Sequence, residues 1–90
     1  MIFSYDSRKD KSNVLKHGIS LLQAPKLNWD EQISWLDKRK DYGELRIIGL
    51  VPMDNRLYCI VYVDLPSSRR IISLRKANNR ETDRYEKETT

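Results

Sequence analysis

The sequence predicts an α+β fold, with a small antiparallel sheet, helices before it in the chain, one helix after it, and the helices packed on one face. Two observations lead to this class. Residues 44–52, 57–64 and 69–76 are apolar segments rich in β-branched and aromatic side chains, and only short polar turns separate them. Segments with helix-capping residues lie on both sides of this run. Since successive strands joined by short turns pair with one another, we expect an antiparallel meander.

The segments before the meander are less regular. Residues 2–5 alternate between apolar and polar side chains and favour a short first strand. Residues 7–17 predict a helix, because Ser7 can cap its start and Gly18 can end it in the left-handed conformation.

A second short helix is predicted within residues 19–29, with Ser20 as a possible cap. Pro25 fits such a helix only in its first turn or at its end. Residues 31–37 favour a short strand, and residues 38–43 favour a polar loop.

After the meander, residues 78–88 predict a final helix. Asn78 and Glu81 stand at the spacing of a capping box, in which each side chain bonds the backbone of the other residue. The apolar side of this helix is thin, and Tyr85 is its main candidate anchor.

Length and charge limit the possible functions. The chain has 90 residues, which predicts one domain over residues 1–90 with a modest core. There are 17 Lys and Arg against 13 Asp and Glu, a net charge of +4 that suits nucleic acid or an acidic partner. The single cysteine, Cys59, excludes a disulfide framework and an intrachain zinc cluster. We expect a cytoplasmic protein with no cofactor, no metal and no membrane contact.

Arg46 is the first candidate for a functional side chain. It interrupts an apolar segment, where a guanidinium without a partner is costly. One explanation is a structural ion pair with Glu44, two residues away on the same face of the strand. The other is an arginine placed to bind a phosphate group with its planar fork of donors.

The segment RIISLRKA, residues 70–77, holds most of the other candidates. Strict alternation puts Arg70 and Lys76 on the face that carries Ile72 and Leu74, which should meet the helices. It puts Ser73 and Arg75 on the opposite face, open to solvent or a ligand. Ser73 can equally be an ordinary packing hydroxyl.

His17 is the only histidine, and it follows Lys16 at the predicted end of a helix. The helix dipole there favours the charged imidazole, so His17 could act as an acid or bind an anion. Alternatively, it caps the last carbonyl groups of the helix. Trp29 and Trp35 favour core or interface positions, although an exposed aromatic ring beside basic residues can stack on a base.

The chain resembles the BrnT toxins, which are RelE-like ribonuclease toxins of type II toxin–antitoxin systems. The resemblance rests on the stretches SNVLKHGIS, DYGELR and RIISLRKANNRETDRYE, in this order and at this spacing, and it covers nearly the whole chain. The last stretch is the most specific, and Leu74 replaces a usual alanine in it. The family motifs GE-x-R and KHG are matched by Gly43, Glu44 and Arg46 and by Lys16, His17 and Gly18.

The chain also departs from the family pattern. Tyr5 stands where a tryptophan is usual in the first strand, and Ile47 stands where a tryptophan usually follows the arginine of GE-x-R. Val63, Asp64 and Leu65 replace a region that commonly carries a threonine and an arginine. An acidic residue there weakens the expectation of activity but not that of the fold.

The resemblance implies a RelE-like sheet with an RNA-cleaving cleft on its free side, cleavage without a metal ion, and inhibition of translation. It implies a cognate BrnA-like antitoxin, and binding of operator DNA through the toxin–antitoxin complex. His17, Arg46, Arg70 and Arg75 would form one catalytic cluster, and Lys16, Glu44, Ser73 and Lys76 would bind substrate. The alternative is an inactive module that binds nucleic acid or an antitoxin in a repressor complex.

Overall fold

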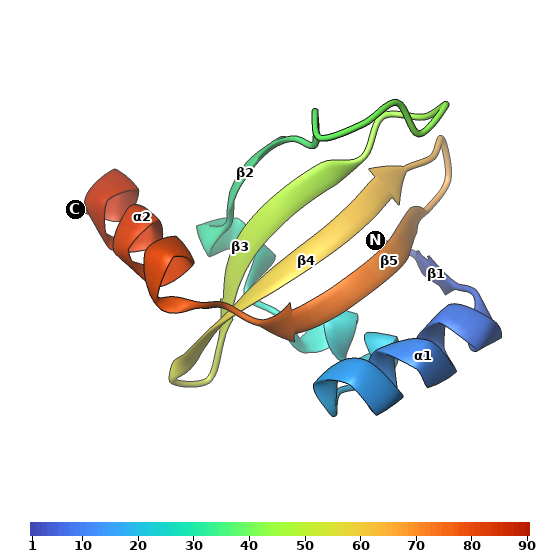
Figure 1. Ribbon diagram of the computed structural model, residues 1–90, viewed down its shortest axis with the longest axis horizontal. Helices are drawn as coiled ribbons and strands as arrows, with labels where there is room; N and C mark the ends of the chain where they lie inside the picture. The colour runs from blue at the N-terminus through green and yellow to red at the C-terminus, as the bar shows by residue number, and fades with distance from the viewer.

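The computed structural model describes residues 1–90 as a five-stranded sheet in the order β1-β5-β4-β3-β2 (Figure 1). The elements follow the chain as β1 (Phe3–Tyr5), α1 (Ser7–His17), two 3₁₀ helices (Leu21–Lys26 and Trp29–Glu31), β2 (Ile33–Leu36), β3 (Ile47–Met53), β4 (Arg56–Asp64), β5 (Arg69–Lys76) and α2 (Asn79–Thr89). The predicted α+β class and the antiparallel pairing of β3, β4 and β5 are confirmed. The arrangement is consistent with a RelE-like fold. β1 differs from the other strands, because it pairs in parallel with β5 at one edge of the sheet.

The predicted helix before the sheet is confirmed, but its start is not capped by Ser7. The carboxylate of Asp6 accepts a hydrogen bond from the backbone of Arg8 at 2.8 Å, and Asp6 has the extended backbone of an N-cap residue. Gly18 ends the helix as predicted, with φ +70° and its N–H bonded to the carbonyl of Val14. Neither α-helix has the length and apolar content that crossing a membrane requires.

The second predicted helix is present as the tighter 3₁₀ form. Ser20 caps it, its side chain accepting a hydrogen bond from the backbone of Leu22, and Pro25 lies next to its last residue. The strand expected within residues 31–37 is β2, and the polar loop after it runs to residue 46.

β3 begins three residues later than predicted, so Glu44 and Arg46 lie in the loop before it. Gly43 adopts φ +71°, which turns the backbone out of the extended conformation immediately before Glu44. The last cross-strand bond at this end joins the N–H of Asp37 to the carbonyl of Arg46 at 2.8 Å.

A β-bulge in β5 changes which side chains share a face. Val61 of β4 pairs with Ser73, but the next residue, Tyr62, pairs with Ile71, so Ile72 has no partner. The extra residue reverses the alternation on its N-terminal side.

Arg70 therefore lies on the same face as Ser73 and Arg75, and the predicted placement of Arg70 beside Leu74 is wrong. Its partner on β4 is Val63, which shares a face with the partner of Arg75, Cys59.

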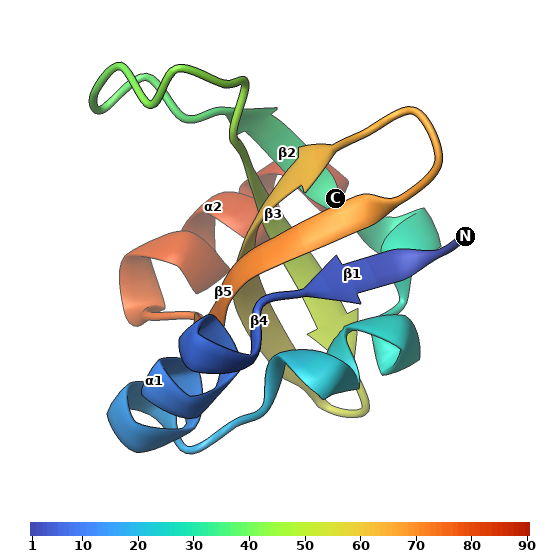
Figure 2. The same cartoon turned by 90° about the vertical axis from the view of Figure 1, so that its right-hand side faces the viewer.

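The sheet packs on both faces. The first face carries the larger core, under α1 and the 3₁₀ helices, and its buried residues are Leu21, Ala24, Leu27, Val51, Ile60, Tyr62, Ile71 and Leu74. The second face carries Ile48, Leu50 and Cys59, with Tyr85 of α2 packed against them. The expectation that all helices cover one face is therefore wrong, and Figure 2 shows α1 and α2 on opposite sides of the sheet.

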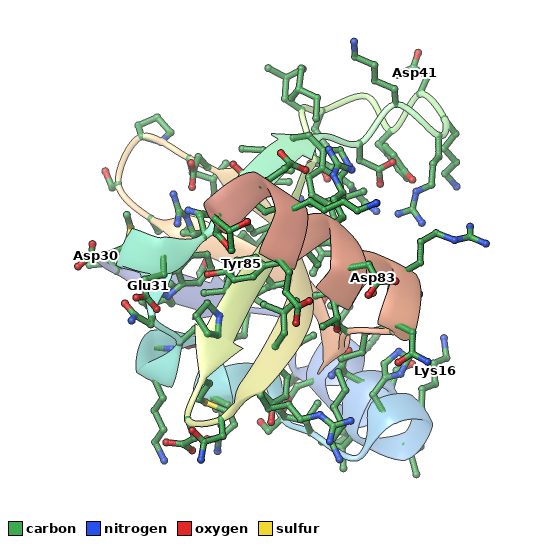
Figure 3. The ribbon with its side chains drawn as sticks, turned by 90° about the vertical axis from the view of Figure 1, so that its left-hand side faces the viewer. Lys16, Asp30, Glu31, Asp41, Asp83 and Tyr85 are labelled. Atoms are coloured by element: carbon green, nitrogen blue, oxygen red, sulfur yellow. The ribbon has the colours of Figure 1, made fainter.

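α2 is held on the second face by few contacts. The hydroxyl of Tyr85 donates to the carbonyl of Glu31 at 2.6 Å, which Figure 3 shows as Tyr85 pointing toward the 3₁₀ turn. The guanidinium of Arg84 lies 3.7 Å from the centre of the Trp35 ring. The predicted capping box of Asn78 and Glu81 is present.

Asn13 joins α1 to the open edge of β5, and sequence reasoning missed it. Its amide nitrogen donates to the carbonyls of Leu74 at 2.7 Å and Ile19 at 2.8 Å, and its oxygen accepts from the N–H of Leu74 at 3.1 Å. β1 ends opposite Ile71, so this side chain replaces a neighbouring strand further along β5.

Candidate functional site

A carboxylate between two arginines lies at one end of the second face. Arg70, at the start of β5, donates to both oxygens of Glu44 at 2.6 and 2.8 Å. Arg46 donates to the same carboxylate through Nε at 3.1 Å. The three side chains are partly exposed, so solvent reaches them. We call Glu44, Arg46 and Arg70 the arginine–glutamate site.

The charge of this site is fixed. Hydrogen bonds from Arg70 and then from Arg46 hold the pKa of Glu44 below its usual value, so Glu44 is ionised near neutral pH. The site therefore carries a net charge of +1. A guanidinium has five donors, and only Nε of Arg46 and one terminal nitrogen of Arg70 are used. The remaining donors can bind a phosphate group beside the carboxylate.

Tyr42 supports one of the arginines. The guanidinium of Arg46 lies 4.3 Å from the centre of the Tyr42 ring, and Nζ of Lys40 lies 5.2 Å from the same centre. Such stacking leaves the in-plane donors of Arg46 available.

Arg75 is on the same face but is bound elsewhere. Its two terminal nitrogens donate to the two oxygens of Glu81 in α2, both at 2.8 Å. This hydrogen-bonded partner raises the pKa of Arg75, which keeps the guanidinium charged. Arg75 and Ser73 line a small pocket of about 140 Å³ over Cys59.

His17 lies at the other end of β5. It lines a groove of about 430 Å³ together with Tyr58 and Lys76, and a second hollow together with Lys16 and Ser73. Six residues of extended strand separate Arg70 from Lys76, a distance of roughly 20 Å. In Figure 3, Lys16 near the end of α1 lies well apart from Asp41 of the loop before Glu44.

The structure thus divides the expected single cluster. It brings Glu44, Arg46 and Arg70 together, and it places Lys16, His17 and Lys76 around the end of α1. Ser73 and Arg75 lie between the two groups.

Asp64, which departs from the family pattern, does not contact the arginine–glutamate site. Asp64 forms an ion pair with Arg69, with oxygen–nitrogen distances of 2.6 and 3.0 Å. Arg69 in turn lies over the rings of Trp29 and Tyr62, at 4.7 and 4.2 Å from their centres, on the first face. The acidic residue is therefore on the opposite side of the sheet from Glu44. Trp29, predicted as a core or interface residue, is partly buried and packs against the core of the first face.

Comparison with known families agrees with this architecture. Residues 5–81 match the sequence model of the ribonuclease toxin BrnT of type II toxin–antitoxin systems, a span that runs from the last residue of β1 through β5 to the start of α2. No curated protein shows significant similarity to the chain. The match covers the first two motif stretches, the third as far as Glu81, and the residues of the arginine–glutamate site. The chain therefore belongs to the BrnT family of ribonuclease toxins.

Proposed function

We propose that the chain cleaves RNA without a metal ion at the arginine–glutamate site, and that this cleavage inhibits translation. One observation carries the proposal: an ionised carboxylate lies between two partly exposed guanidinium groups that keep unused donors. This arrangement places a proton acceptor and a phosphate-binding group next to each other. The family match supplies the class of substrate.

The reaction requires three events. The 2′-hydroxyl of a ribose attacks the adjacent phosphorus and passes its proton to Glu44. Arg46 and Arg70 stabilise the added negative charge on the phosphate oxygens, since arginines do not give up protons but bind developing charge well. The bond to the 5′-oxygen then breaks, this oxygen takes a proton from water at the open site, and the hydroxide so formed takes the proton back from Glu44. The products are a 2′,3′-cyclic phosphate and a 5′-hydroxyl.

The low pKa of Glu44 predicts slow cleavage. A base whose pKa lies well below neutral takes up a proton weakly, so the site depends on positioning and charge rather than on basicity. His17 shares its hollows with Lys16, Ser73 and Lys76 and not with the residues of the arginine–glutamate site. Its proposed role changes from acid or base to RNA binding, together with Lys16 and Lys76.

Ser73 and Arg75 are proposed to bind the RNA strand between these two groups. Arg75 can do so with the donors that Glu81 does not occupy. A cognate BrnA-like antitoxin is the proposed partner, and its complex with the toxin would bind operator DNA. An antitoxin segment with carboxylates would compete with RNA phosphates for Arg46 and Arg70.

The alternative is a module that binds RNA or an antitoxin without cleaving. The observation that favours it is the occupancy of the arginines: Arg46, Arg70 and Arg75 all bind carboxylates of the same chain.

The test is cleavage of a single-stranded RNA of mixed sequence, labelled at its 5′ end, by the purified chain in the presence of a chelator. We expect slow release of fragments with cyclic phosphate ends. Arg70→Ala should lower the rate by about 10²–10³-fold, the size expected for a lost charge stabiliser. Glu44→Gln should lower it by about 10²–10⁴-fold, the size expected for a lost general base. Arg84→Ala is the matched control, because it removes an arginine from the same face without touching the site.

The outcomes separate the candidate functions. RNA binding without fragments would support the inactive module and contradict the ribonuclease. If activity were lost only when the chelator is present, this would contradict cleavage without a metal ion. Equal loss in Arg84→Ala would mean that overall charge, and not this site, determines the rate.

A further inference from the structure

Asp37 is a buried carboxylate that the proposed mechanism does not use. It stands at the end of β2, and its side chain is 1% exposed. One oxygen accepts from the backbone N–H and Nε of Arg39, at 3.1 and 2.8 Å. The other accepts from a terminal nitrogen of Arg39 at 2.7 Å and from the hydroxyl of Tyr42 at 3.0 Å.

These bonds connect Asp37 to the arginine–glutamate site. The Tyr42 hydroxyl is held by Asp37, and the Tyr42 ring lies under the guanidinium of Arg46. The ring fixes the plane of that guanidinium, and the bond to Glu44 fixes its rotation within the plane. Together these two contacts determine the direction of the free donors of Arg46.

The loop has two further closing contacts besides those of this carboxylate. The backbone of Asp37 already bonds Arg46 at 2.8 Å, and Asp41 closes the turn by accepting from the N–H of Gly43 at 2.9 Å. A buried ionised carboxylate is costly unless it is fully hydrogen-bonded. Asp37 and Asn13 are the only buried polar residues in the chain, and Asp37 alone is charged.

The ionised form is secured by its neighbours. Hydrogen bonds from the Arg39 side chain hold the pKa of Asp37 far below its usual value, against the effect of burial. The carboxylate therefore remains an acceptor for Tyr42 at any pH at which the protein would work.

We propose that Asp37 is a positioning residue for RNA cleavage, which holds Tyr42 as a platform beneath Arg46 and so aims Arg46 at the scissile phosphate. The inference rests on the proposed ribonuclease function. Asp37 itself touches no substrate.

The test compares Asp37→Asn with a matched control, Asp64→Asn. Both changes replace a carboxylate that accepts two bonds from the guanidinium group of an arginine near the same end of the sheet, but Asp64 acts on the first face. Tyr42→Phe keeps the ring and loses the hydroxyl, and Tyr42→Leu loses both. Each variant is assayed on labelled mixed-sequence RNA for the maximal cleavage rate and for the enzyme concentration that gives half of it.

We expect Asp37→Asn to lower the maximal rate by about 10–100-fold, because a small displacement of a catalytic group has effects of this size. The half-saturating concentration should change little, since many phosphate contacts determine binding. Tyr42→Leu should match Asp37→Asn, and Tyr42→Phe should retain part of the rate. Asp64→Asn should leave both quantities unchanged.

A second readout does not depend on cleavage. In ¹H–¹⁵N spectra of the arginine side chains, Asp37→Asn should broaden or shift the Nε–H signal of Arg46 and leave that of Arg69 in place. An unchanged Arg46 signal, or a lowered rate with Asp64→Asn as well, would overturn the positioning role. If the wild-type chain does not cleave RNA while the Arg46 signal responds, the proposed function fails and the structural coupling stands.

Discussion

Replacing Asn13 by alanine tests the joint between α1 and β5. The change removes three hydrogen bonds and leaves the N–H and carbonyl of Leu74 without partners, in a residue that is 0% exposed. A buried backbone group without a partner costs about 1–3 kcal/mol. The two groups of Leu74 therefore predict a loss of about 4 kcal/mol in the free energy of unfolding. The carbonyl of Ile19 is partly exposed and can bond water, so it adds little.

This loss is a large share of the total stability, which for small domains is about 5–15 kcal/mol. A water molecule entering the space left by the amide would recover part of it, which sets a lower limit of about 2 kcal/mol. The assay is urea denaturation followed by the fluorescence of Trp29 and Trp35. Asn28→Ala is the control, because it removes one exposed bond to Glu31 and should cost no more than about 0.5 kcal/mol.

A folded Asn13→Ala variant that loses less than about 2 kcal/mol would refute the reasoning. It would mean that the edge of β5 finds other partners, and that α1 is held by its apolar contacts alone.

Three further predictions concern single side chains. As the pH is lowered, cleavage by Arg70→Gln should decline at a higher pH than cleavage by the wild type, because losing this donor raises the pKa of Glu44 and the base is protonated at a higher pH. If the acidic side of the pH–rate profile did not move, Glu44 would be excluded as the base. Burial raises the pKa of Cys59 to about 11, so iodoacetamide should not modify the native protein at neutral pH and should do so in urea, as mass spectrometry can check. Tyr85→Phe should cost about 1 kcal/mol and make α2 more sensitive to protease, because it removes the bond to Glu31; equal digestion of both proteins would contradict this.

The fold could largely be predicted because its main signals are local. The apolar segments of β4 and β5 are bounded by turn residues, and Gly18 and the pair Asn78–Glu81 mark helix ends through backbone chemistry that depends on a few neighbours. The side of the sheet that α2 covers is not a local property. It depends on contacts of Tyr85 with a turn 54 residues earlier in the chain.

One feature of the sequence is consistent with the bulge in β5. Ile71 and Ile72 are consecutive and both buried, which strict alternation between a core face and an open face does not allow. Two neighbouring apolar residues are also common in ordinary strands, so this feature does not identify a bulge by itself. As a result Arg70 was assigned to the wrong face.

The site was predicted in part for the same reason. Glu44 and Arg46 are two residues apart, and their ion pair was one of two interpretations of that spacing; the pair is present. The bond from Arg70 spans 26 residues and depends on the register of the whole sheet. Asn13 and Asp37 lie within polar segments, where nothing in the sequence distinguishes a buried polar side chain from an exposed one.

The parallel pairing of β1 with β5 has a consequence for the order in which the chain folds. Phe3 pairs with Arg69 and Asn13 with Leu74, so the first elements to leave the ribosome need the last strand as their partner. Domains that fold during synthesis generally do so from their N-terminal end. Here β1 and α1 must wait until β5 has emerged, and the arginine–glutamate site is incomplete until the same moment, because Arg70 belongs to that strand. During synthesis the N-terminal segment therefore remains undocked, and Arg70, one of the two arginines of the phosphate-binding group, is not yet in place.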